Sequence, residues 1–259
     1  MPLRCRNLHF TFPHGRAGAV SALEDVTLTL ADEEFVCIVG PSGCGKTTLL
    51  KLMAGLLQPT VGSIDFEGGP RNGRPRNALA FQEHALFPWM SVLDNVAFGL
   101  RMQGVRKQPS HERARAFIEQ VGLARFARSY PHELSMGMRQ RASIARAFVA
   151  DPEMLLMDEP FGSLDALTKL ILQEELLRIW SQHRKLVVYV THDIGEAVLL
   201  GDRVLVMSGR PGRIREEFRI PLARPRNLLD REQPEIVGIR GQIWKILEEE
   251  VRSGLRDAR

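Results

Sequence analysis

Nine consecutive residues, from Gly40 to Thr48, have the types and spacing needed to bind a chain of phosphate groups. They match the phosphate-loop pattern G-x-x-x-x-G-K-[ST] at each fixed position. The glycines let backbone N–H groups converge on phosphate oxygens, Lys46 adds a positive charge, and the Thr47 hydroxyl can ligate Mg²⁺. This predicts a nucleoside triphosphate site. Its predicted residues are Gly40, Pro41, Ser42, Gly43, Cys44, Gly45, Lys46, Thr47 and Thr48.

The sequence on both sides of this loop supplies the elements that would position it. Residues 35–39 are all apolar, as in a strand buried on both faces, and apolar residues recur at helical spacing from Leu49 to Leu57. A strand, a glycine-rich loop and a helix in this order aim a helix N-terminus at an anion. Cys44 lies at that N-terminus, a setting that can favour the thiolate.

A pair of carboxylates follows a later apolar run. Asp158 and Glu159 come directly after residues 154–157, which are Met-Leu-Leu-Met. A carboxylate at the end of a buried strand can hold Mg²⁺, and the next carboxylate can act as a general base on water. Like Lys46, Asp158 comes just past the carboxyl end of a predicted parallel strand, where such sheets bind ligands.

Composition excludes several other classes of protein. The chain has 259 residues, 25% of them charged, and a net charge of +4 without any basic run, so we expect no nucleic-acid ligand. Its three cysteines form no CxxC pair, which argues against a disulfide framework or a zinc site. No run of about 18 apolar residues is present, so we expect no membrane-spanning segment.

Strands and helices alternate along most of the chain, which implies a mostly parallel sheet. Residues 3–12 and 23–30 are predicted strands of a half-exposed antiparallel sheet. From about 84 to 150 helical periodicity replaces strand patterns, which predicts a helical insertion. Further strands are predicted at 35–39, 63–66, 78–81, 154–157, 186–190 and 204–207. Helices are predicted from about 166 to 182 and from Pro234 to a stop at Gly254.

Residues 134–140, Leu-Ser-Met-Gly-Met-Arg-Gln, resemble the L-S-G-G-Q signature of the ATP-binding-cassette ATPases. In that family the signature of one subunit covers the γ-phosphate bound to the other. The resemblance therefore implies a homodimer in which Ser135 and Gly137 contact the nucleotide of the second copy. Met136 departs from the pattern, because it puts a long side chain where the family has its first glycine.

Other family elements occur in the expected order. Gln82 resembles the Q-loop glutamine, which contacts Mg²⁺ or the attacking water, and Asp165 resembles the aspartate of the D-loop at the dimer interface. His192 resembles the switch histidine that contacts the γ-phosphate, and Phe12 stands where the family stacks an aromatic ring on adenine. A core position for Phe12 is the alternative. The implied catalytic residues are Glu159, His192 and Gln82, and the implied metal ligands are Thr47, Gln82 and Asp158.

The resemblance implies an α/β fold. It comprises a RecA-like P-loop NTPase core with a mostly parallel sheet, an antiparallel β subdomain and an inserted α-helical subdomain. The implied cofactors are ATP and Mg²⁺. The implied boundaries are an ABC ATPase domain over 1–230, with its core at 1–83 and 151–225 and its helical subdomain at about 84–150, and a C-terminal helical tail over 231–259.

Two stretches, 161–168 and 209–214, resemble the nitrate/sulfonate/taurine importer subgroup. This implies an ATP-hydrolysing subunit that energises a membrane importer for a small anionic solute. Its implied partners are a second copy, two membrane permease subunits and, indirectly, a periplasmic or lipid-anchored solute-binding protein. The implied location is peripheral, at the cytoplasmic face of the bacterial inner membrane.

Two further expectations concern the partner surface and the alternatives. Residues 86–90 read as exposed apolar surface for a permease contact, and packing inside the helical lobe is the competing interpretation. A soluble cassette ATPase without a membrane partner, of the iron–sulfur assembly type, is the alternative function. A third possibility is a non-hydrolysing binding module, against which Glu159 and His192 argue.

Overall fold

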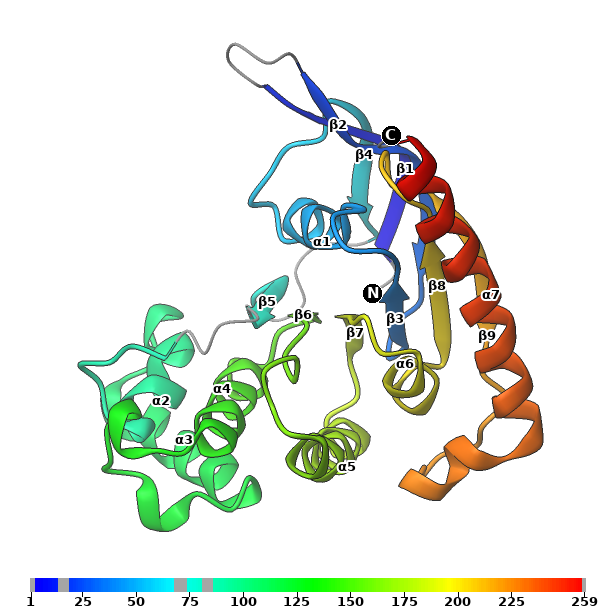
Figure 1. Ribbon diagram of the computed structural model, residues 1–259. Helices are drawn as coiled ribbons and strands as arrows, with labels where there is room; N and C mark the ends of the chain where they lie inside the picture. Colours follow the sequence, from blue (N-terminus) through cyan, green and yellow to red (C-terminus); the bar gives the residue numbers. More distant parts are fainter. Residues whose placement is uncertain (1–2, 14–18, 68–73, 81–85, 258–259) are drawn as a thin grey trace. The chain divides into compact units, whose positions relative to one another are not determined.

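The structure is a computed structural model that describes residues 3–13, 19–67, 74–80 and 86–257 (Figure 1). The chain divides into two compact units, which we call unit 1 and unit 2. Unit 1 is Met1–Gly69 with Leu186–Arg259, and unit 2 is Pro70–Lys185.

Unit 1 contains an antiparallel sheet of three strands in the order β2-β1-β4. These strands are β1 (Leu3–Phe12), β2 (Val20–Leu30) and β4 (Val61–Phe66). Leu3 pairs with Leu30 on one side and with Phe66 on the other. Val26, Leu28 and Leu30 are buried while Thr27 and Thr29 are exposed, so the predicted half-exposed antiparallel pair is confirmed.

A second group of strands in unit 1 surrounds β3 (Phe35–Val39), which is buried along its whole length. β7 (Leu186–Val190) and β8 (Arg203–Met207) run parallel to β3 on either side. β9 (Ile214–Arg219) pairs antiparallel with β8. The sequence did not predict β9, because only Phe218 among its residues is buried and the strand lacks an apolar pattern.

Four helices complete the described part of unit 1: α1 (Lys46–Met53), α6 (Ile194–Leu200), the short 3₁₀ helix η3 (Leu228–Glu232) and α7 (Pro234–Asp257). The prediction that α7 stops at Gly254 is wrong. Gly254 is exposed, and its backbone is not in the left-handed region that ends helices, so the chain tolerates it inside the helix. Ile236 and Ile243 are buried on the side of α7 that packs on its own unit.

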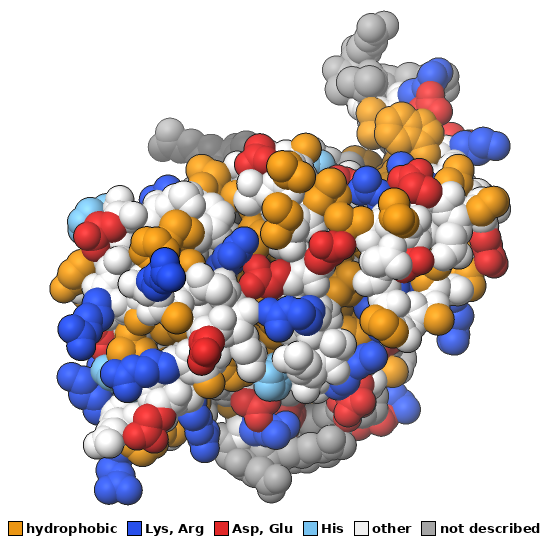
Figure 2. Space-filling model, turned by 90° about the horizontal axis from the view of Figure 1, so that it is seen from below, with side chains coloured by type: hydrophobic (Ala, Val, Ile, Leu, Met, Phe, Trp, Pro, Cys, Tyr) orange, Lys and Arg blue, Asp and Glu red, His pale blue; other side chains and the backbone are white. Residues whose placement is uncertain are grey.

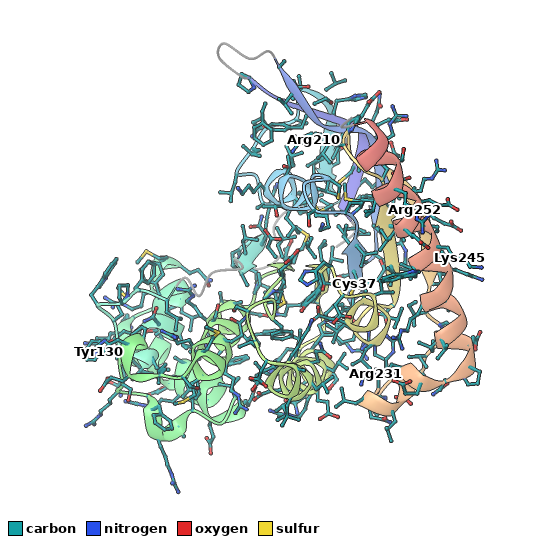
Figure 3. All side chains as sticks on the ribbon, viewed as in Figure 1. Cys37, Tyr130, Arg210, Arg231, Lys245 and Arg252 are labelled. Carbon is teal, nitrogen blue, oxygen red and sulfur yellow. The ribbon has the colours of Figure 1, made fainter. Side chains whose placement is uncertain are left out.

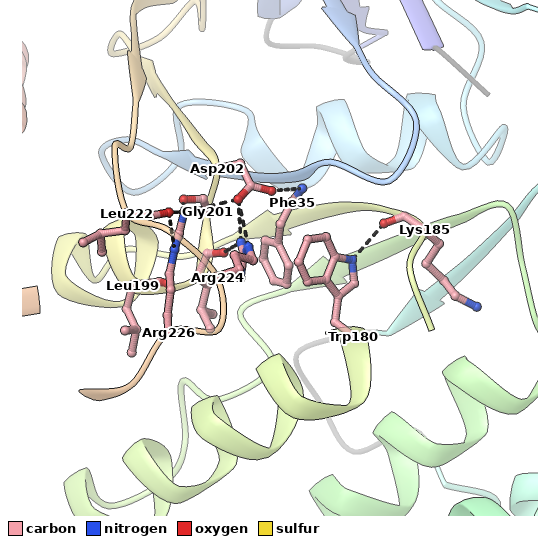
Figure 4. A network of polar contacts seen from close by, with 10 residues as sticks. Phe35, Trp180, Lys185, Leu199, Gly201, Asp202, Leu222, Arg224 and Arg226 are labelled. Carbon is pink, nitrogen blue, oxygen red and sulfur yellow. Dashed lines mark hydrogen bonds and ion pairs between the residues drawn. The ribbon is translucent and has the colours of Figure 1, made fainter. Parts of the chain in front are cut away.

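The end of α6 and the start of β8 are held by one polar network (Figure 4). The Asp202 carboxylate accepts a hydrogen bond from the Phe35 N–H at 3.0 Å. It also forms ion pairs with Arg224 and Arg226. The buried Arg226 also donates to the carbonyl oxygen of Leu199, in the last turn of α6, and to that of Gly201, the C-cap. A cation here satisfies carbonyls that a helix end leaves without partners.

In unit 2 the strand β5 (Asn77–Ala80) pairs parallel with β6 (Met154–Asp158), and four α-helices follow the strands in the chain or lie between them. α2 (Val92–Met102), α3 (Lys107–Gln120) and α4 (Met136–Val149) pack together, with the 3₁₀ turns η1 (Ala124–Phe126) and η2 (Pro131–Glu133) between them (Figure 1). α5 (Ala166–Gln182) has the bounds that its periodicity predicts.

No helix in the described part of the chain is long and apolar enough to cross a membrane. On the face drawn in Figure 2, basic and acidic side chains are interspersed with apolar ones rather than gathered by sign. This agrees with the small net charge of +4.

Candidate nucleotide-binding site

The phosphate loop lies between the end of β3 at Val39 and the start of α1 at Lys46, so the predicted strand–loop–helix order is confirmed. Gly43 and Gly45 have φ angles of +76° and +105°, a region that favours glycine. A Cβ on Gly45 would lie 2.7 Å from a methyl carbon of Leu23 and 2.8 Å from the Ala22 carbonyl oxygen. The loop can therefore adopt this path only with glycine at that position.

Lys46 and Thr47 differ in exposure as their expected roles require. The Lys46 side chain is buried, and its Nζ donates to the carbonyl oxygens of Gly40 at 2.8 Å and Pro41 at 2.9 Å. This positions the ammonium group inside the curve of the loop. Thr47 is exposed at the helix N-terminus, whereas Thr48 is buried. A hydroxyl that faces solvent beside a phosphate loop suits Mg²⁺, which prefers oxygen ligands.

Cys44 corrects one expectation. The side chain is buried, with its Sγ 3.9 Å from the Lys46 Nζ. Burial raises the pKa of the Cys44 thiol, and the nearby Lys46 charge offsets this only in part. The helix N-terminus does not make Cys44 a thiolate, because the loss of solvation outweighs the favourable field.

The turn between β8 and β9 packs on the phosphate loop, which sequence reasoning missed. A Cβ on Gly212 would lie 2.0 Å from the Cys44 carbonyl oxygen, so only glycine fits. The Gly212 N–H donates to the Ala22 carbonyl at 3.0 Å, and the Gly212 carbonyl accepts from the Glu24 N–H at 3.0 Å. Residues 209–214 include Gly212, but in the sequence this stretch indicates only the resemblance to the importer subgroup.

The same turn places Arg210 beside the loop (Figure 3). A Cβ on Gly43 would lie 3.8 Å from an Nη of the exposed Arg210. Unit 1 thus has a second cation, besides Lys46, at the phosphate loop. No local sequence pattern predicts this approach, because Arg210 comes 167 residues after Gly43.

His192 follows β7 directly, and β7 is the neighbour of the phosphate-loop strand. Ile38 of β3 pairs with Val190, and the Thr191 N–H donates to the Ile38 carbonyl at 3.1 Å. The carboxyl ends of β3 and β7 therefore lie side by side, as parallel strands require. The His192 side chain is exposed at this edge of the sheet.

A buried glutamate, which the sequence analysis did not single out, holds the backbone around His192. Glu196 accepts hydrogen bonds from the hydroxyls of Tyr189 and Thr191. The Thr191 hydroxyl in turn accepts from the Asp193 N–H at 3.0 Å, and the Asp193 carboxylate accepts from the Glu196 N–H at 3.1 Å. This closed set of bonds fixes both neighbours of His192 while leaving its side chain exposed.

Phe12 does not belong to the core. Its side chain is 39% exposed and packs edge-to-face on Phe10, with ring centroids 4.8 Å apart. Phe10 itself is buried. The structure therefore favours the interpretation in which one face of the Phe12 ring is available to a ligand.

Within unit 2, Asp158 ends β6 and is buried, and Glu159 follows it with a φ of +44°. A left-handed backbone is uncommon for a glutamate and costs free energy. The Glu159 carbonyl accepts from the Gly162 N–H at 3.0 Å, which turns the chain sharply after the strand.

The signature segment starts α4, and Ser135 is its N-cap, as predicted. The Ser135 hydroxyl accepts from the Met138 N–H at 3.3 Å. Met136 is 41% exposed, so its long side chain lies outward rather than inside the unit. A Cβ on Gly137 would lie 3.1 Å from a methyl group of Thr168, which explains the small residue there.

Asp165 is the N-cap of α5. Its carboxylate accepts from the Thr168 N–H at 3.0 Å, and these hydrogen bonds lower the pKa of Asp165. Gln82 lies outside the described residues. The predicted site residues thus fall on two units: Phe12, the phosphate loop and His192 on unit 1, and Ser135, Gly137, Asp158, Glu159 and Asp165 on unit 2.

Comparison with known proteins connects this geometry to a family. The ABC transporter family matches residues 23–162. An uncharacterized ABC transporter ATP-binding protein of Methanocaldococcus jannaschii is 48% identical over 241 residues, which cover 92% of this chain and 88% of that protein. A taurine import ATP-binding protein of Roseobacter denitrificans is 41% identical, with 99% and 98% of the two chains covered.

A second taurine import ATP-binding protein, from Jannaschia sp., is 41% identical over 95% of this chain and 96% of its own length. Among solved structures, the dimeric structure of a bacterial ABC transporter cassette matches with a TM-score of 0.74 and 30% identity, covering 85% of this chain and 100% of that one. The same cassette in a post-hydrolysis state bound to ADP and Pi matches with a TM-score of 0.73.

Proposed function

This chain belongs to the ABC transporter family, and from that premise we propose that it is the ATP-hydrolysing subunit of an importer for a small anionic solute of the nitrate, sulfonate or taurine type. The observation that carries the proposal is the match to two taurine import ATP-binding proteins over nearly the whole of both chains. The soluble iron–sulfur assembly alternative is not favoured, because these relatives are named for import.

ATP hydrolysis requires binding, alignment of a water molecule and a proton acceptor. Lys46 and the N–H groups of the phosphate loop hold the phosphates, and the ring of Phe12 stacks on the adenine. Thr47, Asp158 and Gln82 are the oxygen donors proposed to hold Mg²⁺, which when bound offsets the charge of the phosphates.

The bond-making step uses carboxylate and imidazole groups. Glu159 accepts a proton from the attacking water as its oxygen bonds to the γ-phosphorus, while the bond from that phosphorus to the bridging oxygen breaks and ADP leaves. His192, held by the hydrogen bonds around Glu196, contacts the γ-phosphate. A second copy contributes Ser135, Gly137 and Asp165, so that each nucleotide lies between two chains.

The permease contact is proposed on the segment before α2. Leu86 is buried, so the expectation that it supplies exposed surface is wrong, but Trp89 is 69% exposed. The buried Asn95 holds this segment rigidly, because its amide accepts from the Phe87 N–H at 2.7 Å and donates to the carbonyls of Phe87 and Met90. A rigid turn that displays one indole suits docking of an apolar helix.

A co-purification experiment tests this function. The tagged chain, expressed in its native cells, should retain a permease through detergent extraction, and Trp89→Glu should reduce the retained permease by about tenfold. Met102→Glu is the matched control, because Met102 is 67% exposed in the same unit and lies outside the proposed contact. A wild-type chain that never retains a membrane protein would contradict the importer function.

A second experiment tests the role of ATP in transport. Cells that lack the chain should lose uptake of the solute, and the wild-type gene should restore uptake. Lys46→Ala should not restore it, whereas Lys51→Ala, a half-buried lysine of the same helix, should. Uptake driven by Lys46→Ala would remove ATP binding at this loop from the proposal.

A further inference from the structure

A groove of about 910 Å³ runs between α7 and the residues 192–195 that follow β7. One wall is the helix, and the other contains His192. Both walls belong to unit 1, and Glu232 of η3 also lines the groove. The groove is much larger than one side chain, so its size fits a helix or a ligand rather than a packing defect.

The wall formed by α7 contains a row of exposed apolar residues. Val237, Trp244 and Val251 recur every seven residues and are 47%, 63% and 46% exposed. Leu247 lies beside them in the groove. A seven-residue repeat is the spacing by which one helix packs along another, so the exposed row is suited to a second helix.

Two of the charged residues on this wall, Arg240 and Glu248, are placed symmetrically about Trp244. Arg240 comes four residues before Trp244, and Glu248 comes four residues after it. Arg240 is half-buried, and no other described residue forms an ion pair with it. Glu248 pairs with Arg252 of the same helix at 2.6 Å, which leaves its second carboxylate oxygen available to another cation.

We infer that this groove receives α7 of a second copy of the chain, with the two helices antiparallel about a two-fold axis near Trp244. In that arrangement Trp244 meets its own copy, Val237 meets Val251 of the second copy, and Arg240 meets Glu248 of the second copy. A two-fold contact is self-complementary in this way. A parallel pairing would instead place Arg240 against another Arg240, and both helix dipoles would point the same way.

The α7 pairing rests on the proposed function, because His192 takes part in both contacts. His192 lines the groove and also contacts the nucleotide that two copies share in that proposal. One pair of helices buries less than the roughly 1,000 Å² of a stable interface, so α7 adds to the nucleotide-dependent contact and does not replace it.

Disulfide trapping in the full-length chain tests the geometry. The native cysteines Cys5, Cys37 and Cys44 are all buried, so wild type should not cross-link under mild oxidation. Trp244→Cys should cross-link with itself. Val237→Cys and Val251→Cys should each cross-link poorly alone but form a mixed dimer when combined, because disulfides require Cα atoms within about 7 Å.

Exchanging the charges of Arg240 and Glu248 tests the pairing independently. The dissociation constant of the dimer is measured by analytical ultracentrifugation. Trp244→Glu and Arg240→Glu should each raise the dissociation constant of the dimer by about tenfold. Mixing Arg240→Glu chains with Glu248→Arg chains should restore part of the lost affinity. Met102→Glu is the control for Trp244→Glu, because Met102 is a large apolar residue that is 67% exposed in unit 2 and lies outside both proposed contacts, and it should pair as wild type does.

Three outcomes would overturn the inference. They are self-cross-linking of Val237→Cys and of Val251→Cys without a mixed product, no cross-linking of any variant above wild type, and a dimer dissociation constant of Trp244→Glu equal to that of wild type. If the α7 contact does not form but ATP still pairs the chains, the proposed function stands and only this inference is excluded. Conversely, cross-linking in a chain that does not hydrolyse ATP would contradict the proposed function and support this contact.

Discussion

The Tyr189 hydroxyl donates a hydrogen bond to the carboxylate of Glu196 at 2.6 Å, and both side chains are buried. Burial, and then the nearby Glu196 charge, raise the pKa of Tyr189 well above its ordinary value, so this hydroxyl stays protonated and remains a donor. The bond joins the end of strand β7 to the first turn of α6, with His192 between them. The backbone on both sides of His192 therefore depends on the buried Glu196.

Glu196→Ala should destabilise the protein and slow ATP hydrolysis more than it weakens ATP binding. Two buried hydroxyls, those of Tyr189 and Thr191, would lose their acceptor, at about 1–3 kcal/mol each. Urea unfolding and saturating-ATP kinetics measure the two effects. Glu196→Gln keeps an acceptor and should recover most of the stability; equal kcat values in wild type and Glu196→Ala would exclude a positioning role.

Gly212→Ala should weaken ATP binding although Gly212 is far from the loop in sequence. The added Cβ would lie 2.0 Å from the Cys44 carbonyl oxygen, so the phosphate loop must move, at about 1–3 kcal/mol. Gly209→Ala is the control in the same turn, because its nearest contact would be an ordinary 3.7 Å. Calorimetric titration with ATP separates the variants; similar affinities for both would show that the turn does not support the loop.

Glu159→Gln should bind ATP as tightly as wild type but hydrolyse it at least about 100-fold more slowly, because the amide cannot accept a proton from water. The dimer should then accumulate in ATP, since the nucleotide is not consumed. Glu174→Gln, an exposed glutamate of α5, is the control. Unchanged turnover in Glu159→Gln would assign the proton to another group.

Cys44 should react slowly with iodoacetamide at pH 7.5, at least tenfold more slowly than in the urea-unfolded chain. Burial raises the pKa of its thiol, so less thiolate is present in the folded protein than in the unfolded chain. By linkage, a raised pKa stabilises the fold fully below the unfolded thiol pKa, and this contribution is lost as pH rises above it. Labelling of Cys44→Ala corrects for Cys5 and Cys37; rapid labelling at Cys44 would contradict its burial.

The sequence by itself determined the phosphate loop, the buried strands and most helices. Each of these depends on neighbours in the chain: a left-handed backbone requires Gly45, a run of five apolar residues predicts β3, and Ser135 caps α4 through a residue three positions away. Local patterns predict local geometry because the groups that interact are a few residues apart. Site residues could be named for the same reason, from motifs of fixed spacing.

Only the tertiary structure decided which distant groups meet. The pKa of the Cys44 thiol is raised because the fold buries it. Gly212 must be glycine because a chain segment far along the sequence packs on the phosphate loop, and Glu196 matters because β7 brings two hydroxyls to it. The exposed row of Val237, Trp244 and Val251 on α7 can likewise be identified only from the structure, in which Ile236 and Ile243 are the residues that are buried. Burial and contact between remote segments follow from packing, which no short window of sequence contains.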